Sequence, residues 1–204
     1  MSGVEEPMAG EQEKESLGGA SSAVDYKIAL FAVYLAVLQS QASRVSDCLG
    51  LEWSLTKAEY GQSFGSFFPF YVSQHQDDTC VLLHVVATGV LLVMCVKDYR
   101  VALSMGLSAL AGLSSKELTR SLSHGLVEMA IMQGIFLMSM LHMKAPWTRA
   151  VGVPAVCYGL AWVGHFFFER NRPATFVYPV YSLLGDWKLF ANYLQRLIGS
   201  VGVS

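Results

Sequence analysis

Two of the five histidines in this chain are each followed, four positions later, by a glutamate. The pairs are His165–Glu169 and His124–Glu128. Residues four apart project from one face of a helix. An imidazole and a carboxylate stacked in this way can bind a metal ion, relay a proton or contact an acidic headgroup. The sequence therefore offers two candidate reactive pairs, each beside an apolar stretch.

The other histidines also lie near the ends of apolar stretches. His75 and His84 flank the start of 79–96, and His142 lies at the end of 125–143. Imidazole nitrogen binds zinc, iron, copper and nickel. A single histidine at a helix end is more often an interfacial hydrogen-bonding residue than a ligand, so only a group of them favours a metal site.

The composition is that of a chain surrounded by lipid. Hydrophobic residues make up 53% and charged residues 15%, against roughly 25% charged in an average soluble domain. A net charge of −2 without a basic tract gives no basis for a nucleic-acid partner. The cysteines have no metal-site spacing such as C-x-x-C; they are Cys48, Cys80, Cys95 and Cys157.

The hydropathy pattern predicts an all-α, polytopic membrane protein with about four transmembrane helices. The four apolar stretches are 79–96, 101–113, 125–143 and 150–168. Two further segments are expected to be interfacial or packed helices: 26–38, which is too short to span about 30 Å, and the amphipathic 182–198. An acidic, Gly- and Ser-rich tail, 1–25, is predicted to be disordered, and 26–204 to form a single helical membrane domain.

Four crossings would gather the histidines on one side of the bilayer. His75, His84, His124 and His165 would then share the side that holds the N-terminus, and His142 would lie opposite. This grouping predicts a metal site made by the first four. A slight excess of Lys and Arg on their side favours a cytosolic location.

Neighbouring charged residues allow more than one interpretation. Glu128 and Glu169 could ligate the metal, orient an imidazole through its other nitrogen, or form structural ion pairs. Arg170 and Arg172 could extend to lipid headgroups or bind a substrate carboxylate through two hydrogen bonds. The sequence leaves these alternatives open.

Two tracts resemble the membrane-embedded 2-hydroxy-fatty-acid dioxygenases, which are related to the 2-hydroxypalmitate dioxygenase of the endoplasmic reticulum. The tracts are Gly164-His165-Phe-Phe-Phe-Glu169-Arg170-Asn-Arg-Pro173-Ala174 and Phe70-Tyr71…His75…Leu83-His84. Many short members of that family have Asn in place of Cys80, and the match is weakest at His124.

The resemblance implies an Fe(2+)-dependent enzyme that uses O₂ to cleave C1–C2 of 2-hydroxy fatty acids. The product would be the fatty acid one carbon shorter, in fatty acid α-oxidation and phytosphingosine degradation. It implies that His75, His84 and His165 are metal ligands. In this interpretation His124 is the fourth ligand, Glu128 and Glu169 are catalytic, and Arg170 and Arg172 bind substrate.

Two other classes remain open. A membrane hydroxylase or desaturase with two irons would carry clustered HxxxH and HxxHH boxes, whereas the closest histidines here are His75 and His84, nine positions apart. A membrane scaffold or lipid-binding protein would keep the fold without the chemistry. Bound iron separates the three classes: one equivalent indicates the dioxygenase, two the hydroxylase or desaturase, and none the scaffold.

Overall fold

The computed structural model describes residues 63–116, 118–119, 121–122 and 124–201. These residues are almost entirely helical, and no strand occurs among them. The all-α prediction is therefore confirmed. The predictions for the tail 1–25 and for a helix over 26–38 lie outside the described residues.

The four apolar stretches all form helices. They are α4 (Asp78–Lys97), α5 (Tyr99–Ser115), α6 (Leu126–His142) and α7 (Trp147–Val163), which continues as a π-helical turn, η1 (Gly164–Glu169). A short helix, α3 (Phe64–Ser73), precedes them. A 3-10 turn, η2 (Ala174–Phe176), leads into α8 (Pro179–Val201), which contains the predicted amphipathic helix.

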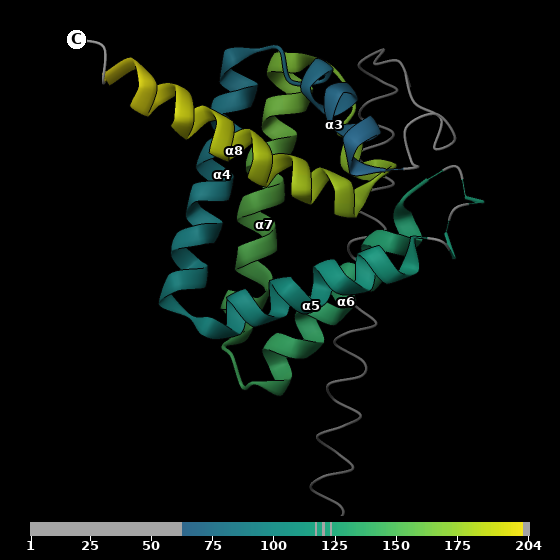
Figure 1. Cartoon of the computed structure of the whole chain (residues 1–204). Coiled ribbons are helices and arrows are strands. Elements are labelled where there is room, and N and C mark those ends of the chain that lie inside the picture. Colours follow the sequence, from purple (N-terminus) through teal and green to yellow (C-terminus); the bar gives the residue numbers. More distant parts are fainter. Residues whose placement is uncertain (1–62, 117, 120, 123, 202–204) are drawn as a thin grey trace, which may run out of the picture.

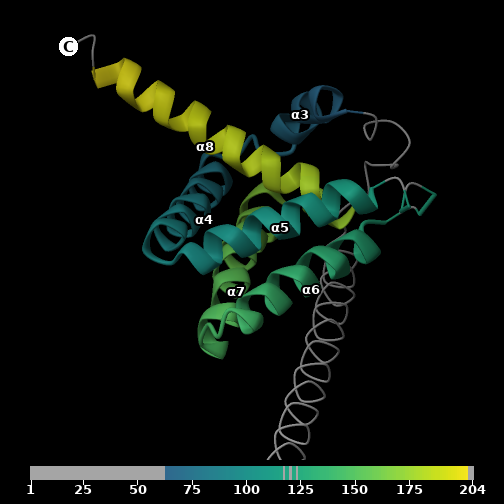
Figure 2. The same cartoon turned by 60° about the horizontal axis from the view of Figure 1, so that its bottom comes forward.

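The helices do not form four parallel spans. Figure 1 shows α4 and α7 side by side, with α5 and α6 forming a hairpin that runs across them. The turned view in Figure 2 shows the same hairpin, again with its two helices alongside each other. The chain thus leaves the α4 axis after residue 98 and returns to it only with α7.

The predicted count of four spans is not confirmed. Among the described residues, only α4 and the continuous helix Trp147–Glu169 are long and apolar enough to cross a membrane. Helices α5 and α6 have 17 residues each and reach about 26 Å, short of the roughly 30 Å hydrocarbon core. Their apolar residues serve in part to pack the hairpin, since α6 buries Met132, Phe136, Leu137 and Met140.

The two long helices keep much of their apolar surface outside the protein core. In the most apolar 18-residue segment of α4, only 33% of the residues are buried. In the corresponding segment of Trp147–Glu169, 22% are buried. One side of α4 exposes Leu82, Val86, Val90 and Val93 at helical spacing. An exposed apolar surface of this kind indicates contact with lipid or a partner.

Two apolar clusters hold the helices together. The first fills the space between α4, α5, α6 and α7, around Leu91, Val101, Phe136 and Val153. The second joins α3 to η2 and α8 and is mainly aromatic. In it Phe67 and Tyr71 are almost wholly buried. The second cluster fixes the end of α3 and the chain that follows it.

The contact between α8 and α3 requires a glycine. A Cβ at Gly185 would lie 2.8 Å from two carbon atoms of the Tyr71 ring. Such an approach is shorter than van der Waals contact allows, so a side chain at this position would push α8 away from the aromatic cluster.

We therefore expect Gly185→Ala to lower the free energy of unfolding by about 1–3 kcal/mol, through overpacking. Gly199→Ala on the same helix is the matched control, because a Cβ there meets nothing within 4 Å. It should leave stability unchanged or raise it by up to about 1 kcal/mol. Unfolding of the two variants in detergent tests this, and equal stability would contradict the packing described.

Candidate metal centre

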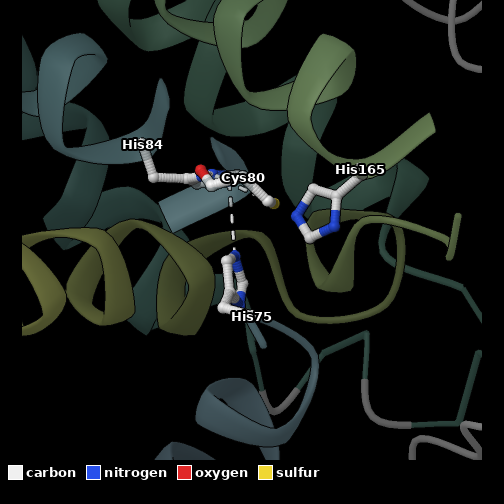
Figure 3. A group of neighbouring side chains, drawn as sticks. All are labelled: His75, Cys80, His84 and His165. Atoms are coloured by element: carbon white, nitrogen blue, oxygen red, sulfur yellow. Dashed lines mark hydrogen bonds between the residues drawn. The ribbon is translucent and has the colours of Figure 1, made fainter. Parts of the chain in front are cut away.

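Three imidazoles and one thiol meet at the junction of α3, α4 and η1. The residues are His75, Cys80, His84 and His165, all buried, with ligand-capable atoms within 4.8 Å of one another. His75 follows α3, Cys80 and His84 lie on α4, and His165 lies in η1. Figure 3 shows the three imidazoles approaching one another from these different elements.

The imidazoles form a nearly equilateral triangle. Their ring centroids are 4.5 Å apart for His75–His84, 4.7 Å for His75–His165 and 4.9 Å for His84–His165. The ring planes are close to perpendicular in each pair, between 72° and 87°. The Nε2 atoms of His75 and His84 are 3.3 Å apart, so nitrogen atoms of different rings face a common space.

Backbone carbonyl groups fix the tautomers of two of these rings. Nδ1 of His75 lies 2.7 Å from the carbonyl oxygen of Tyr71, and Nδ1 of His84 lies 2.9 Å from that of Cys80. A carbonyl oxygen only accepts, so each Nδ1 carries the hydrogen and donates it. The neutral rings therefore direct the lone pair of Nε2 toward the other histidines.

The third ring is oriented by a side-chain amide. Nδ1 of His165 lies 2.7 Å from Oδ1 of Asn171. The orientation of this amide is fixed, because Nδ2 of Asn171 donates to the carbonyl oxygen of Gln74 at 2.9 Å. Exchanging the amide oxygen and nitrogen would break that hydrogen bond. Asn171 thus presents its oxygen to Nδ1 of His165, so this nitrogen carries the hydrogen. Nε2 of His165 therefore keeps its lone pair, as in the other two rings.

The resulting donor set suits a divalent transition metal. Metal-binding histidines usually donate their second nitrogen to a carbonyl or carboxylate oxygen, which orients the ring and raises its basicity. Burial, together with nearby His84 and His165, holds the pKa of His75 well below its usual range. The ring is therefore neutral at physiological pH, as a metal ligand must be.

A close helix contact and an unusual turn bring His165 to this position. A Cβ at Gly164 would lie 3.1 Å from Sγ and 3.3 Å from Cα of Cys80, so α4 and η1 touch here. Arg170 then adopts φ 55°, in the left-handed region. This residue and Asn171 both donate their backbone N–H to the carbonyl oxygen of His165. The reversal brings the Asn171 amide back to the imidazole.

The structure places neither predicted glutamate in the histidine group. Glu169 accepts hydrogen bonds from the backbone N–H groups of Gln76, at 2.9 Å, and Asp77, at 2.7 Å. It thereby holds the loop that carries His75. Glu128 is buried and accepts from the N–H of Val180 at 3.0 Å, in the first turn of α8.

Glu169 ends the π-helical turn η1, which also contains His165. The sequence predicted that these two residues, four apart, would act together from one face. In the structure His165 joins the histidine group, whereas the carboxylate of Glu169 binds the backbone of the loop before α4. The two residues therefore serve the same site in different ways, one as a candidate ligand and one by holding the chain that carries His75.

His124 does not join the group either. Its Nδ1 accepts the backbone N–H of Leu126 at 3.3 Å, at the start of α6. The even number of crossings that placed it with the other three assumed that α5 and α6 run alongside α4 and α7. Because the hairpin runs across those helices instead, His124 stays outside the group. His142 is exposed, at the end of α6.

A cavity extends from the histidines into the helix bundle. The cavity has a volume of about 80 Å³. His84 and His165 line it, together with polar residues of α3, η2 and α8, namely Tyr71, Thr175, Ser182 and Asp186. Farther from the histidines its wall is mainly apolar and includes Leu91, Met105, Met132, Phe136, Val153 and Pro154.

The depth of the cavity follows from the two helices that form its wall. Along α4 the lining residues run from His84 to Leu91, about 10 Å at 1.5 Å per residue. Along α7 they run from His165 back to Val153, about 18 Å. Neither Arg170, which is exposed, nor Arg172, which is buried, lines this space.

A tyrosine and an aspartate support His75 from the side of the cavity. The Tyr71 ring stacks on the His75 ring, with centroids 4.1 Å apart and planes 27° apart. The Tyr71 hydroxyl donates to the carboxylate of Asp186. Burial raises the pKa of both groups. Tyr71 thus holds His75 through its ring as well as through its carbonyl oxygen.

Sequence reasoning missed several of these residues. Nothing in the local sequence around Asn171 marks it as the partner of His165. Cys80 was set aside for its spacing to other cysteines. It precedes His84 by four positions, the same helical spacing that singled out the glutamates. Its Sγ lies 3.7 Å from Nδ1 of His84, on the side of the ring away from Nε2.

Comparison with known proteins identifies one family. The family model described as "2-hydroxy-palmitic acid dioxygenase Mpo1-like" matches residues 61–198. These residues include both tracts on which the sequence resemblance rests, as well as every helix from α3 to α7. No curated protein and no solved structure matches the chain.

If Nε2 of each ring binds one metal ion, His75→Ala, His84→Ala and His165→Ala should each abolish stable metal binding while the protein still inserts and folds. Asn171→Ala removes only the orienting hydrogen bond and should weaken metal affinity by about 10- to 100-fold. Metal analysis of detergent-purified protein, loaded anaerobically with Fe(II), measures both effects.

His142→Ala and His124→Ala serve as matched controls, since neither residue belongs to the group. Both should retain about one equivalent of metal. Equal metal loss in all five histidine variants would mean that general destabilisation, and not ligand removal, is being measured.

Proposed function

Because the chain belongs to the Mpo1-like family of 2-hydroxy-palmitic acid dioxygenases, we propose that it is a membrane-bound, Fe(2+)-dependent dioxygenase of 2-hydroxy fatty acids. The reaction is cleavage of C1–C2 with O₂, giving the fatty acid one carbon shorter. One observation carries the proposal. Three imidazoles that direct Nε2 to a common space lie at the polar end of a cavity whose other end is apolar.

The ligand set suits both the metal and an acidic substrate. His75, His84 and His165 are neutral donors, so they leave the charge of a bound divalent ion uncompensated. That charge attracts a carboxylate. Three protein ligands also leave coordination positions open, as in catalytic metal sites. Bound Fe(2+) supplies the activation of O₂, for which imidazole-containing sites with open positions are suited.

The lining of the cavity matches the two ends of a fatty acid, polar beside the histidines and mainly apolar deeper in the bundle. Its acidic end would lie beside His84 and His165, and its acyl chain would follow α4 and α7 toward Leu91 and Val153. The helices that line the cavity expose apolar side chains on their outer faces. An acyl chain would therefore be in apolar surroundings both in the bilayer and in the cavity.

The overall reaction balances without a reductant. Conversion of R–CH(OH)–COOH to R–COOH and CO₂ removes four electrons from carbon, and one O₂ accepts four electrons to give oxygen at the oxidation level of water. The products are the shortened acid, CO₂ and H₂O. A hydroxylase or desaturase needs two further electrons from outside, so independence of any reductant distinguishes the proposed reaction from those alternatives.

The proposed location is the endoplasmic reticulum membrane, with the metal site on the cytosolic side. Support for a membrane comes from the two long apolar helices and their exposed surfaces. The compartment and the place in phytosphingosine degradation follow from the family resemblance.

Purified, iron-loaded protein should consume 2-hydroxyhexadecanoate and O₂ in about equal amounts and release the fifteen-carbon acid, with no reductant added. In the proposed reaction the metal would bind the substrate through both its carboxylate and its 2-hydroxyl group. Hexadecanoate lacks the hydroxyl and should therefore be inert. A site built for a substrate hydroxyl can reject the analogue without it by about 10⁴-fold.

Changes in chain length should matter less than loss of the hydroxyl. Each methylene group is in apolar surroundings both in lipid and in the cavity, so the usual ~0.8 kcal/mol per CH₂ largely cancels. Comparable turnover of the hydroxylated and plain acids, or a strict need for a reductant, would rule out this reaction and favour a hydroxylase or desaturase.

A further inference from the structure

The cavity wall contains polar atoms that the protein itself leaves without a hydrogen bond. Among the described residues, Nε1 of Trp162, Oγ of Ser182 and Oε1 of Gln133 are buried and have no partner. All three residues line the cavity that contains His84 and His165. Buried polar atoms in folded proteins are nearly always bonded to protein, water or ligand. Their presence in one wall therefore points to a polar group inside the cavity.

Two of these residues lie within about one helical turn of residues at the histidine end of the cavity. Trp162 precedes His165 by three positions on the continuous helix Trp147–Glu169, and both residues line the cavity. Ser182 is 2% exposed and lies one turn of α8 before Asp186, which binds Tyr71 beside His75. Gln133 lies deeper, where its Nε2 donates to the hydroxyl of Tyr158 at 2.7 Å.

We propose that the indole N–H of Trp162 and the hydroxyl of Ser182 bind the substrate carboxylate. This inference rests on the proposed function, in which a fatty acid places its acidic end beside the metal. The indole nitrogen can only donate, and a serine hydroxyl can donate or accept. A carboxylate has two oxygens that accept hydrogen bonds, so it matches both groups.

Neutral donors suit this position better than arginine does. A guanidinium beside a metal dication would be repelled by it, and its burial in an apolar cavity would be costly. The cavity wall accordingly contains neither Arg170 nor Arg172. Hydrogen bonds from neutral groups to a charged acceptor are stronger in surroundings of low polarity. Trp162 and Ser182 are thus substrate-binding residues that select an acid over its neutral derivatives.

The test measures binding without turnover, on the full chain loaded with Fe(II) under anaerobic conditions in detergent. Trp162→Phe keeps the aromatic ring and removes the N–H, and Ser182→Ala removes the hydroxyl. Each should raise the dissociation constant of 2-hydroxyhexadecanoate about 10- to 100-fold, the effect of one hydrogen bond to a charged group. The dissociation constant of its methyl ester should change much less, and bound iron should not change.

Two matched controls separate this role from general effects. Ser104 is also fully buried with its Oγ unpartnered among the described residues, but it does not line the cavity. Trp147 is exposed, at the start of α7. Ser104→Ala and Trp147→Phe should bind both ligands as the unchanged protein does. Calorimetric titration gives the constants, and thermal unfolding confirms that each variant is folded.

Wild-type affinity for the acid in both Trp162→Phe and Ser182→Ala would overturn the proposal, because the two atoms would then contact only water. Equal weakening of acid and ester would overturn it as well, since that result reports the shape of the cavity. Acid preference that depends on the two residues, without any cleavage once O₂ is admitted, would support the subsite and reject the dioxygenase reaction. Cleavage of the acid by both variants with wild-type dissociation constants would support the dioxygenase reaction and reject the carboxylate subsite.

Discussion

The structure depends on the burial of three imidazole rings whose free lone pairs face one another. Nε2 of His75 and Nε2 of His84 are 3.3 Å apart, and each ring already uses its hydrogen on Nδ1. Moving a hydrogen to Nε2 would turn the lone pair of Nδ1 against a carbonyl oxygen. Two acceptors in contact repel each other, and burial disfavours an added proton. A metal ion between the rings removes the repulsion.

The elements around the site can be understood as supports for this arrangement. The aromatic cluster of α3 and α8 positions Tyr71, whose carbonyl and ring hold His75. Glu169 holds the loop between α3 and α4 through two backbone N–H groups. Gly164 lets η1 approach α4 closely enough for His165 to face His84. Each support acts on a different ring or on the chain that carries it.

Residue type and hydropathy predicted a substantial part of this. Hydropathy predicted the helical class and the four apolar helices. The position of imidazoles at the ends of apolar stretches singled out His75, His84 and His165 as candidate ligands. Helix α8 was also predicted, from its amphipathic spacing. These features depend on local sequence, because the hydrophobic periodicity of a segment reflects its own secondary structure.

The remaining features depend on contacts between distant segments. Glu169 binds the backbone N–H groups of Gln76 and Asp77, more than 90 positions away, and its spacing to His165 does not indicate that contact. His124 lies outside the group because α5 and α6, of 17 residues each, pack as a hairpin across the bundle, and hydropathy alone does not separate such helices from short spans. Asn171 acts on His165 only through a chain reversal at Arg170, a residue type that rarely signals a left-handed turn.

X-ray absorption at the iron edge of the full chain, loaded anaerobically with Fe(II), tests the central claim most directly. Coordination through Nε2 of His75, His84 and His165 predicts one iron with about three imidazole nitrogens and the remaining positions filled by oxygen. The scattering should contain no iron–iron distance and no sulfur ligand, because Sγ of Cys80 lies on the Nδ1 edge of His84. Iron bound without imidazole scattering, or a short iron–iron distance, would contradict the account.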